Sequence, residues 1–151
     1  MNMMSGLTVI VEQARLTDAA CVAELDAWVC AHPDSTPFQR PAWIMGVEAG
    51  TGQKAKMLVA RRAGGDIVGV LPLTYIRSAL FGRALVGSGF AVDGGLLTTH
   101  RKAGPALADA AFALAATPAG RICSPRSTCR RSRLPVSPSS PRCWSAWARR
   151  W

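Results

Sequence analysis

The stretch KMLVARRAGGDIVGVLPLT, residues 56–74, decides the fold, because it predicts two strands joined by a tight turn. Met57–Ala60 supplies the apolar part of the first strand, and the second strand continues as an almost unbroken apolar run from Ile67. Between them, Ala63–Asp66 contains two glycines, which adopt positive φ angles without steric cost. We expect a β-hairpin with a bulge or an edge position at Pro72, because proline lacks the N–H group that a central strand donates.

The residues before this hairpin predict a strand and then a helix. The segment Leu7–Gln13 alternates apolar and polar residues, which is typical of a half-buried strand. Thr17 offers its hydroxyl group as a helix N-cap, and Asp18 suits the positive end of the helix dipole in the first turn. The apolar residues that follow recur at helical spacing and define the face that this helix buries: Cys21, Val22, Leu25, Trp28 and Val29.

The remaining elements complete a mixed α+β domain with the order β-α-α-β-β-β-(β)-α. Pro41 suits the first position of the second helix, because the N–H group at that position needs no partner inside the helix. The elements are a short helix that begins at Pro41 and ends at Gly50 or Gly52, a loop at Tyr75–Arg83, short strands at Ala84–Gly89 and Ala91–Leu97, and a last helix from near Pro105.

The composition changes near Thr117–Pro118, and we therefore expect a domain at 1–118 and a tail at 119–151. The chain has a net charge of +9, from 18 basic and 9 acidic residues. All 9 acidic residues precede Pro118, whereas the tail carries 8 arginines and neither lysine nor acidic residues. The basic character of the protein is therefore a property of the tail.

Two interpretations of the tail remain open. Its arginines could neutralise the phosphates of a nucleic acid or another polyanion, with Trp144, Trp147 and Trp151 stacking on bases. Alternatively, the tail is an out-of-frame and disordered product of GC-rich coding DNA, whose shifted codons yield the same residue types. The second interpretation is the leading one, because the helical pattern Gly104–Ala116 breaks off where the tail begins.

The sequence also excludes several classes of protein. Met1–Gln13 lacks the basic and apolar regions of a secretory signal, and no stretch approaches the ~20 apolar residues of a membrane helix. We therefore expect a cytoplasmic protein without a transmembrane segment. Cys21 and Cys30 are expected to be buried thiols on opposite faces of a helix. The tail cysteines lack the close spacing of a zinc site, so no metal site is predicted.

Few residues are candidates for catalysis. His32 and His100 have no serine or cysteine partner at a suggestive position, so a catalytic triad has no support and a solvated or capping role is favoured. Glu48 and Asp93 are the carboxylates nearest to apolar segments, and each is either a general base or a hydrogen-bonded structural group. The segment Gly50–Lys54 lacks the spacing and the strand-to-helix context of a phosphate-binding loop.

The candidates for ligand binding lie in the second half of the domain. Arg77 and Arg83 flank a loop, Ser78–Gly82, and their guanidinium groups could hold a phosphate or a carboxylate; the alternative is a solvated loop. The glycine-rich segments Gly87–Gly89 and Gly94–Gly95 could let backbone amides approach an anion, although turns at strand ends use the same residues.

These segments together resemble the FemAB-like proteins, especially those associated with exosortase (PEP-CTERM) and exopolysaccharide loci. The similarity covers roughly residues 7–116. It is carried, in chain order, by Thr36–Trp43, Met57–Ala60, Ile67–Leu73, Arg77–Arg83, Ser88–Val92 and Gly94–Gly95.

The resemblance implies a partial GNAT-like acyl-CoA N-acyltransferase fold. In the Fem family two such domains stand in tandem, and an aminoacyl group passes from aminoacyl-tRNA to the amine of a peptidoglycan precursor. For this chain the resemblance implies transfer of an acyl or aminoacyl group to an amine in cell-envelope chemistry. Arg77, Arg83 and Phe90 are the candidate substrate-binding residues that it offers, and no catalytic residue can be carried over.

The sequence also departs from the family. The later strands and the second domain of the family are missing. We therefore expect an N-terminal fragment that is inactive alone and has no cofactor of its own; in the parent family aminoacyl-tRNA or acyl-CoA is the donor. The alternative is a non-enzymatic α/β module that binds nucleic acid or another polyanion through its basic tail.

Overall fold

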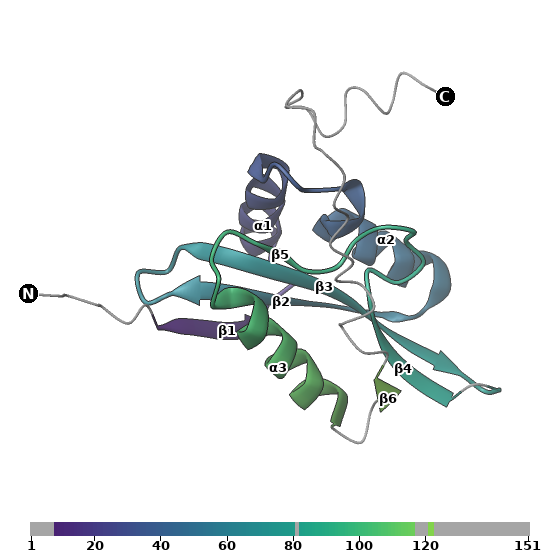
Figure 1. Cartoon of the computed structure of the whole chain (residues 1–151). Coiled ribbons are helices and arrows are strands. Elements are labelled where there is room, and N and C mark those ends of the chain that lie inside the picture. The colour runs from purple at the N-terminus through teal and green to yellow at the C-terminus, as the bar shows by residue number, and fades with distance from the viewer. Residues whose placement is uncertain (1–7, 81, 117–120, 123–151) are drawn as a thin grey trace, which may run out of the picture.

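The computed structural model describes residues 8–80, 82–116 and 121–122 (Figure 1). Within these residues the protein is a mixed α+β domain, as predicted, with one sheet and helices on both of its faces. The elements are β1 (Val9–Gln13), α1 (Ala19–Ala31), the 3-10 helix η1 (Pro37–Gln39), α2 (Pro41–Thr51), β2 (Lys54–Arg62), β3 (Ile67–Ser78), β4 (Gly82–Gly87), β5 (Leu97–Thr98), α3 (Ala103–Ala116) and β6 (Arg121–Ile122).

In the described part of the chain the strands form a single sheet in the order β1-β2-β3-β4-β6, and β5 pairs with β3 beside β4. All neighbours are antiparallel except β4 and β6, which are parallel and are connected through α3. Apart from β6, the predicted tail at 119–151 lies outside the described residues. The prediction that it is out of frame and disordered therefore stays a prediction.

The predicted hairpin is confirmed and forms the centre of the sheet. β2 and β3 pair along their length, and Gly65 adopts a φ of 92° in the turn between them. The register shifts once, where Ala60 pairs with Gly69 but Arg61 pairs with Ile67, so Val68 is the extra residue of a bulge.

Pro72 lies neither at an edge nor at that bulge, which corrects the prediction. It pairs with Met57 inside β3, and its carbonyl accepts a hydrogen bond from Ser88 N at 3.0 Å. The ladder from β4 to β3 ends at Leu73, and that from β5 starts at Val70. The missing N–H of Pro72 therefore points into the gap between two partner strands, where no ladder bond is lost.

The segment Tyr75–Arg83 is a second hairpin rather than the predicted loop. β3 continues to Ser78 and pairs with β4, with Ser78 opposite Gly82. The predicted strand Ala91–Leu97 is also wrong, because only Leu97 belongs to β5. Local apolar alternation does not reveal where a strand finds a partner, and the partner decides its length.

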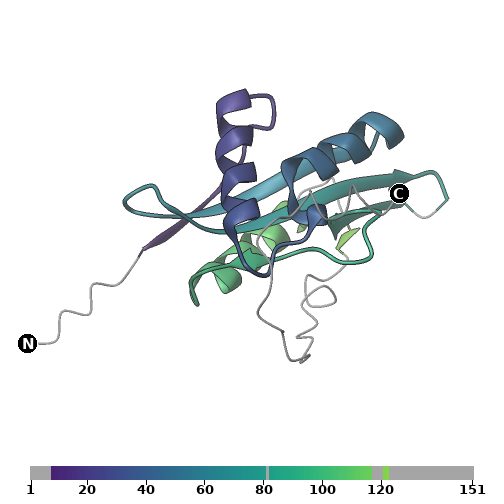
Figure 2. The ribbon, with the colours of Figure 1, turned by 90° about the horizontal axis from the view of Figure 1, so that it is seen from above.

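α1 and α2 cover one face of the sheet (Figure 2). Asp18, not Thr17, is the N-cap of α1, and its carboxylate accepts a hydrogen bond from Ala20 N at 2.9 Å. α2 starts at Pro41, as predicted, and ends at Gly52, which has a left-handed φ of 72°. The buried residues of this layer are Leu25, Val29, Ile44, Met57, Val59, Ile67, Val70 and Leu97.

The predicted apolar stripe of α1 is only partly buried. Leu25 and Val29 are buried, and Trp28 and Cys21 pack partly exposed against the same core. Cys30 is exposed, which corrects the prediction of a second buried thiol. No helix among the described residues is long and apolar enough to cross a membrane.

α3 covers the opposite face of the sheet (Figure 1). Its small residues let the helix approach the sheet closely, so that a Cβ atom on Gly69 would lie 3.2 Å from Ala103 Cβ and 3.0 Å from Leu107 Cδ1. The buried residues of this layer are Leu58, Ala60, Val68, Leu71, Leu73, Leu85, Ala103, Leu107, Ala111 and Ala115.

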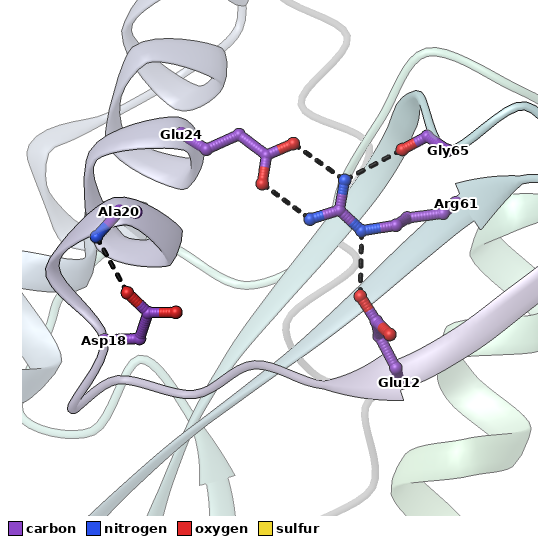
Figure 3. A network of polar contacts seen from close by, with 6 residues as sticks. All are labelled: Glu12, Asp18, Ala20, Glu24, Arg61 and Gly65. Atoms are coloured by element: carbon purple, nitrogen blue, oxygen red, sulfur yellow. Dashed lines mark hydrogen bonds and ion pairs between the residues drawn. The ribbon is translucent and has the colours of Figure 1, made fainter.

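One arginine ties α1 to the edge of the sheet (Figure 3). Arg61 of β2 donates to Glu24 of α1 through two nitrogens, each at 2.7 Å, and to Glu12 of β1 at 2.8 Å. It also donates to the carbonyl of Gly65 in the hairpin turn. The hydrogen bond from Arg61 lowers the pKa of the Glu24 carboxyl group below its ordinary value.

Replacing Gly69 by alanine is expected to lower the free energy of unfolding by about 1–3 kcal/mol, because the added methyl group overpacks the contacts with Thr98 of β5 and with α3. Gly64→Ala is the matched control, since a Cβ atom added there would meet nothing within 4 Å and the residue has no positive φ. Urea denaturation measures both variants. Equal stability of the two variants would show that α3 does not pack closely on β3.

Arg61→Gln is expected to cost less than about 1 kcal/mol at pH 7, because the half-exposed Glu24 is screened by water. A carboxyl group whose folded pKa is lowered stabilises the fold above its unfolded pKa, and this stabilisation disappears as the pH falls through the folded pKa. The loss should therefore shrink at pH 3. Arg62→Gln, at an exposed neighbour, is the control, and a loss independent of pH would contradict the ion pair.

Candidate functional site

The chain leaves β4 through a strained turn. Ala91 N donates to Ser88 O at 3.0 Å, which closes a β-turn over Ser88–Ala91. Two non-glycine residues of this turn have positive φ angles, 41° at Ser88 and 63° at Phe90. Phe90 occupies the third position of the turn, where a positive φ is normally supplied by glycine or asparagine. A bulky side chain is disfavoured by about 1–2 kcal/mol in this region.

Buried contacts hold the turn in place. Gly89 N donates to Thr74 Oγ1 at 3.1 Å, and Gly89 O accepts from Trp43 Nε1 of α2 at 3.3 Å. A Cβ atom on Gly89 would lie 2.6 Å from Thr74 Cβ, so this position has no room for a side chain. Phe38 of η1 packs edge-on against Trp43 with ring centroids 4.7 Å apart. Thr74 of β3 and Trp43 of α2 thus hold the turn on the α1/α2 face, and Phe38 of η1 packs against Trp43.

The hydroxyl oxygen of Ser88 is unusual because it is buried without a hydrogen bond among the described residues. Ser88 is 1% exposed, and its Oγ has no hydrogen-bond partner in the described part of the chain. A Cβ atom on Gly94 would lie 2.7 Å from this Oγ, so the backbone of Gly94 passes directly over it. A buried polar group without a partner destabilises a fold by about 1–3 kcal/mol, which adds to the cost of the turn.

The strained turn presents an aromatic side chain to the surface. Phe90 is 62% exposed and Val92 is 96% exposed, so the buried core does not compensate for the conformation of Phe90. Backbone strain that packing does not repay is concentrated at functional sites in proteins. We therefore assign Ser88–Phe90, with Thr74 and Trp43 behind it, as one candidate site.

The structure brings two of the three predicted substrate-binding residues together. Arg77 and Arg83 stand directly opposite one another across β3 and β4, and both are exposed. Gln53, which the sequence did not single out, holds Arg77 in place. Its Oε1 accepts from Arg77 N at 2.6 Å, and its Nε2 donates to Arg77 O at 3.3 Å.

Phe90 lies apart from these arginines. β4 runs four residues from Arg83 to Gly87 before the turn begins, a distance of about 13 Å along a strand. The turn contacts Thr74, whereas Arg77 is three positions further along β3 and therefore projects from the other face of the sheet. The three predicted substrate-binding residues therefore lie in two places, with Phe90 at the turn and the two arginines on the other face of the sheet.

Glu48 is a poor candidate for a general base. Its carboxylate accepts hydrogen bonds from Lys54 Nζ at 2.7 Å and from Ala55 N at 2.8 Å. These two bonds, the Lys54 bond first, lower the pKa of Glu48, which weakens its affinity for a proton. Glu48 is therefore a hydrogen-bonded structural group rather than a general base. Asp93, the other candidate, is exposed in the loop after the turn.

The histidines have structural positions. His32 Nδ1 accepts from Asp34 N at 3.1 Å, which leaves the proton on Nε2 to be donated to Thr98 O at 3.2 Å. His100 Nδ1 accepts from Lys102 N at 3.3 Å just before α3. No cluster of three metal-ligating side chains occurs among the described residues.

A pocket of about 450 Å³ lies between α1 and α2. Its polar wall is an ion pair, in which Arg40 Nε donates to Asp26 Oδ1 at 2.7 Å and Arg40 Nη2 to Asp26 Oδ2 at 2.5 Å. Sequence patterns did not indicate this pocket, since its walls come together only where α1 and α2 pack side by side. The remaining lining is mostly apolar: Leu16, Thr17, Ala19, Val22, Ala23, Ala42 and Met45.

Comparisons with protein-family models, with curated proteins and with solved structures each give no match to this chain.

Phe90→Gly is expected to raise the free energy of unfolding by about 0.5–1 kcal/mol, because glycine adopts the positive φ of this position without strain. Val92→Gly, at a position that is also exposed but has no positive φ, is the control and should leave stability unchanged or lower it. Thermal and urea denaturation measure the effect. A less stable Phe90→Gly variant would show that Phe90 contributes to the core.

Proposed function

We propose that this chain carries the opening domain of a FemAB-like N-acyltransferase with a GNAT-like fold. The complete enzyme would transfer an acyl or aminoacyl group to the amine of a cell-envelope precursor in the cytoplasm. The 151-residue chain would lack this activity by itself. The proposal rests on the resemblance of six sequence segments and on one structural observation.

That observation is the order and layering of the elements. The described strands and helices follow the order β-α-α-β-β-β-(β)-α that the residue patterns predicted, with α1 and α2 on one face and α3 on the other. The first part of this order, β-α-α-β-β-β, agrees with the first half of a GNAT-like domain. α3 then leads to β6, which adds to the sheet in parallel beside β4. Because Arg121–Ile122 belong to the predicted tail, the support for the proposal comes from the elements up to α3.

The strained turn supplies the proposed contact with substrate. Acyl transfer to an amine requires donor and acceptor to be held in a fixed geometry, which a rigid surface provides better than a mobile loop. The turn is rigid because Thr74, Trp43 and the carbonyl of Pro72 hold it by hydrogen bonds. We propose that Phe90 packs against one of the two substrates of the complete enzyme.

The experiment joins residue 117 to the sequence that the neighbouring reading frame of the gene encodes. The extended chain and the 151-residue chain are incubated with acetyl-CoA or alanyl-tRNA, labelled with ¹⁴C in the acyl group, and with a peptidoglycan precursor that has a free amine. We expect the extended chain, but not the 151-residue chain, to transfer the label to the acceptor. Phe90→Gly in the extended chain should lower the rate about tenfold or more.

Two outcomes would contradict this proposal. One is a neighbouring frame that encodes no further strand or helix pattern. The other is specific RNA binding by the 151-residue chain that weakens steeply with salt and is lost when Arg130, Arg131 and Arg133 are replaced by glutamine, which would favour the polyanion-binding alternative.

A further inference from the structure

The β3–β4 hairpin ends in an exposed apolar loop. Ser78 pairs with Gly82, and Gly82 has the left-handed φ of 81° that short hairpin loops often need at their last position. Such loops are usually built from glycine and polar residues, whereas this one contains Ala79 and Leu80, which are both exposed. Leu80 is 82% exposed and packs in neither of the buried clusters of the described residues.

This loop projects from the body of the domain. In both views of the ribbon the end of the hairpin extends past the helices (Figure 1, Figure 2). Burial along β3 falls from Thr74, which is buried, through the half-buried Ile76 to Arg77, which is exposed. Gln53 holds this end of the strand, because its side chain forms hydrogen bonds with the backbone N–H and C=O of Arg77. Leu80 therefore lies at the apex of a protruding element whose base is fixed.

The charged side chains of the hairpin are all positive. No aspartate or glutamate occurs between Asp66 and Asp93. The charged residues of this stretch are Arg77 and Arg83, which are both exposed and lie three positions before and after Leu80. An apolar apex with cations behind it matches the surface of an anionic bilayer, where negative headgroups lie above the acyl chains.

We propose that this hairpin docks the protein on the surface of an anionic lipid bilayer, with Leu80 inserted at the boundary between headgroups and acyl chains. The long side chain of Arg77 can stay at the level of the headgroups while the apex enters the bilayer. A bilayer fits this element better than a protein partner does, because a specific protein interface buries about 800 Å² on each side. The convex apex of one hairpin does not supply such a surface. The inference goes beyond the proposed acyl transfer and does not depend on it.

The test measures how the full 151-residue chain partitions onto vesicles of phosphatidylcholine, with and without about 30% phosphatidylglycerol, by cosedimentation. The arginines of the tail should attract the chain to anionic vesicles by themselves, so the comparison is between variants of equal net charge. Leu80→Asp is expected to weaken partitioning about tenfold or more, because it replaces the apolar apex by a negative charge. Val92→Asp, in the exposed loop after β4, is the matched control and should weaken partitioning less than about twofold.

Arg77→Gln tests the contribution of the basic residues. It should weaken partitioning about fivefold on the anionic vesicles and leave partitioning on phosphatidylcholine alone unchanged. Arg62→Gln changes the net charge equally, at an exposed arginine of the other hairpin, and should have little effect. All these substitutions lie at exposed positions, and melting temperatures equal to that of the parent chain will show that the variants are folded.

Hydrogen–deuterium exchange provides a second, local measurement. Anionic vesicles should slow the exchange of the amides of Ala79 and Leu80 in the parent chain but not in Leu80→Asp. Exchange in the β2–β3 turn at Gly64 and Gly65 should not change. Equal weakening of partitioning by Leu80→Asp and Val92→Asp, or unchanged exchange in the hairpin loop of vesicle-bound chain, would overturn the proposal and assign the binding to the basic tail.

Discussion

The requirement that both faces of strand β3 be covered determines the rest of this structure. Every residue from Ile67 to Thr74 is buried, so the strand needs a helix layer above and below it. Leu71 and Leu73 contribute to the α3 layer, and Val70 contributes to the α1/α2 layer. A strand that is buried on both sides must also find hydrogen-bonding partners on both edges, because an unpaired buried amide destabilises the fold.

The edge of β3 opposite β2 is shared by two strands, and this division produces the candidate site. β5 pairs with Gly69 and Val70, and β4 pairs from Leu73 onward. Between them the chain turns away from the sheet at Ser88 while remaining attached to Pro72 by a hydrogen bond. Proline at this position needs no partner for its nitrogen, so the sheet tolerates the interruption. The strained turn is thus a consequence of how β3 is completed.

The same strand separates two chemical environments. Where Thr74 faces the α1/α2 layer, the surface is aromatic and apolar, with Trp43 behind the turn and Phe90 exposed in front of it. Where Arg77 faces the other side, the surface is basic. The two environments therefore lie on opposite faces of the sheet, and no single pocket joins them among the described residues.

The sequence alone determined the local elements. It predicted the β2–β3 hairpin and the proline start of α2, because apolar periodicity, glycine turns and proline positions act within a few residues. Only the tertiary structure showed that Arg77 pairs with Arg83 across β3 and β4 and that Gln53 forms hydrogen bonds with the backbone of Arg77. It also showed the positive φ of Phe90. Each of these depends on strand register or on contacts between distant segments, and the pattern of neighbouring residues does not encode them. The fold class was therefore readable from the chain, whereas the candidate sites required the structure.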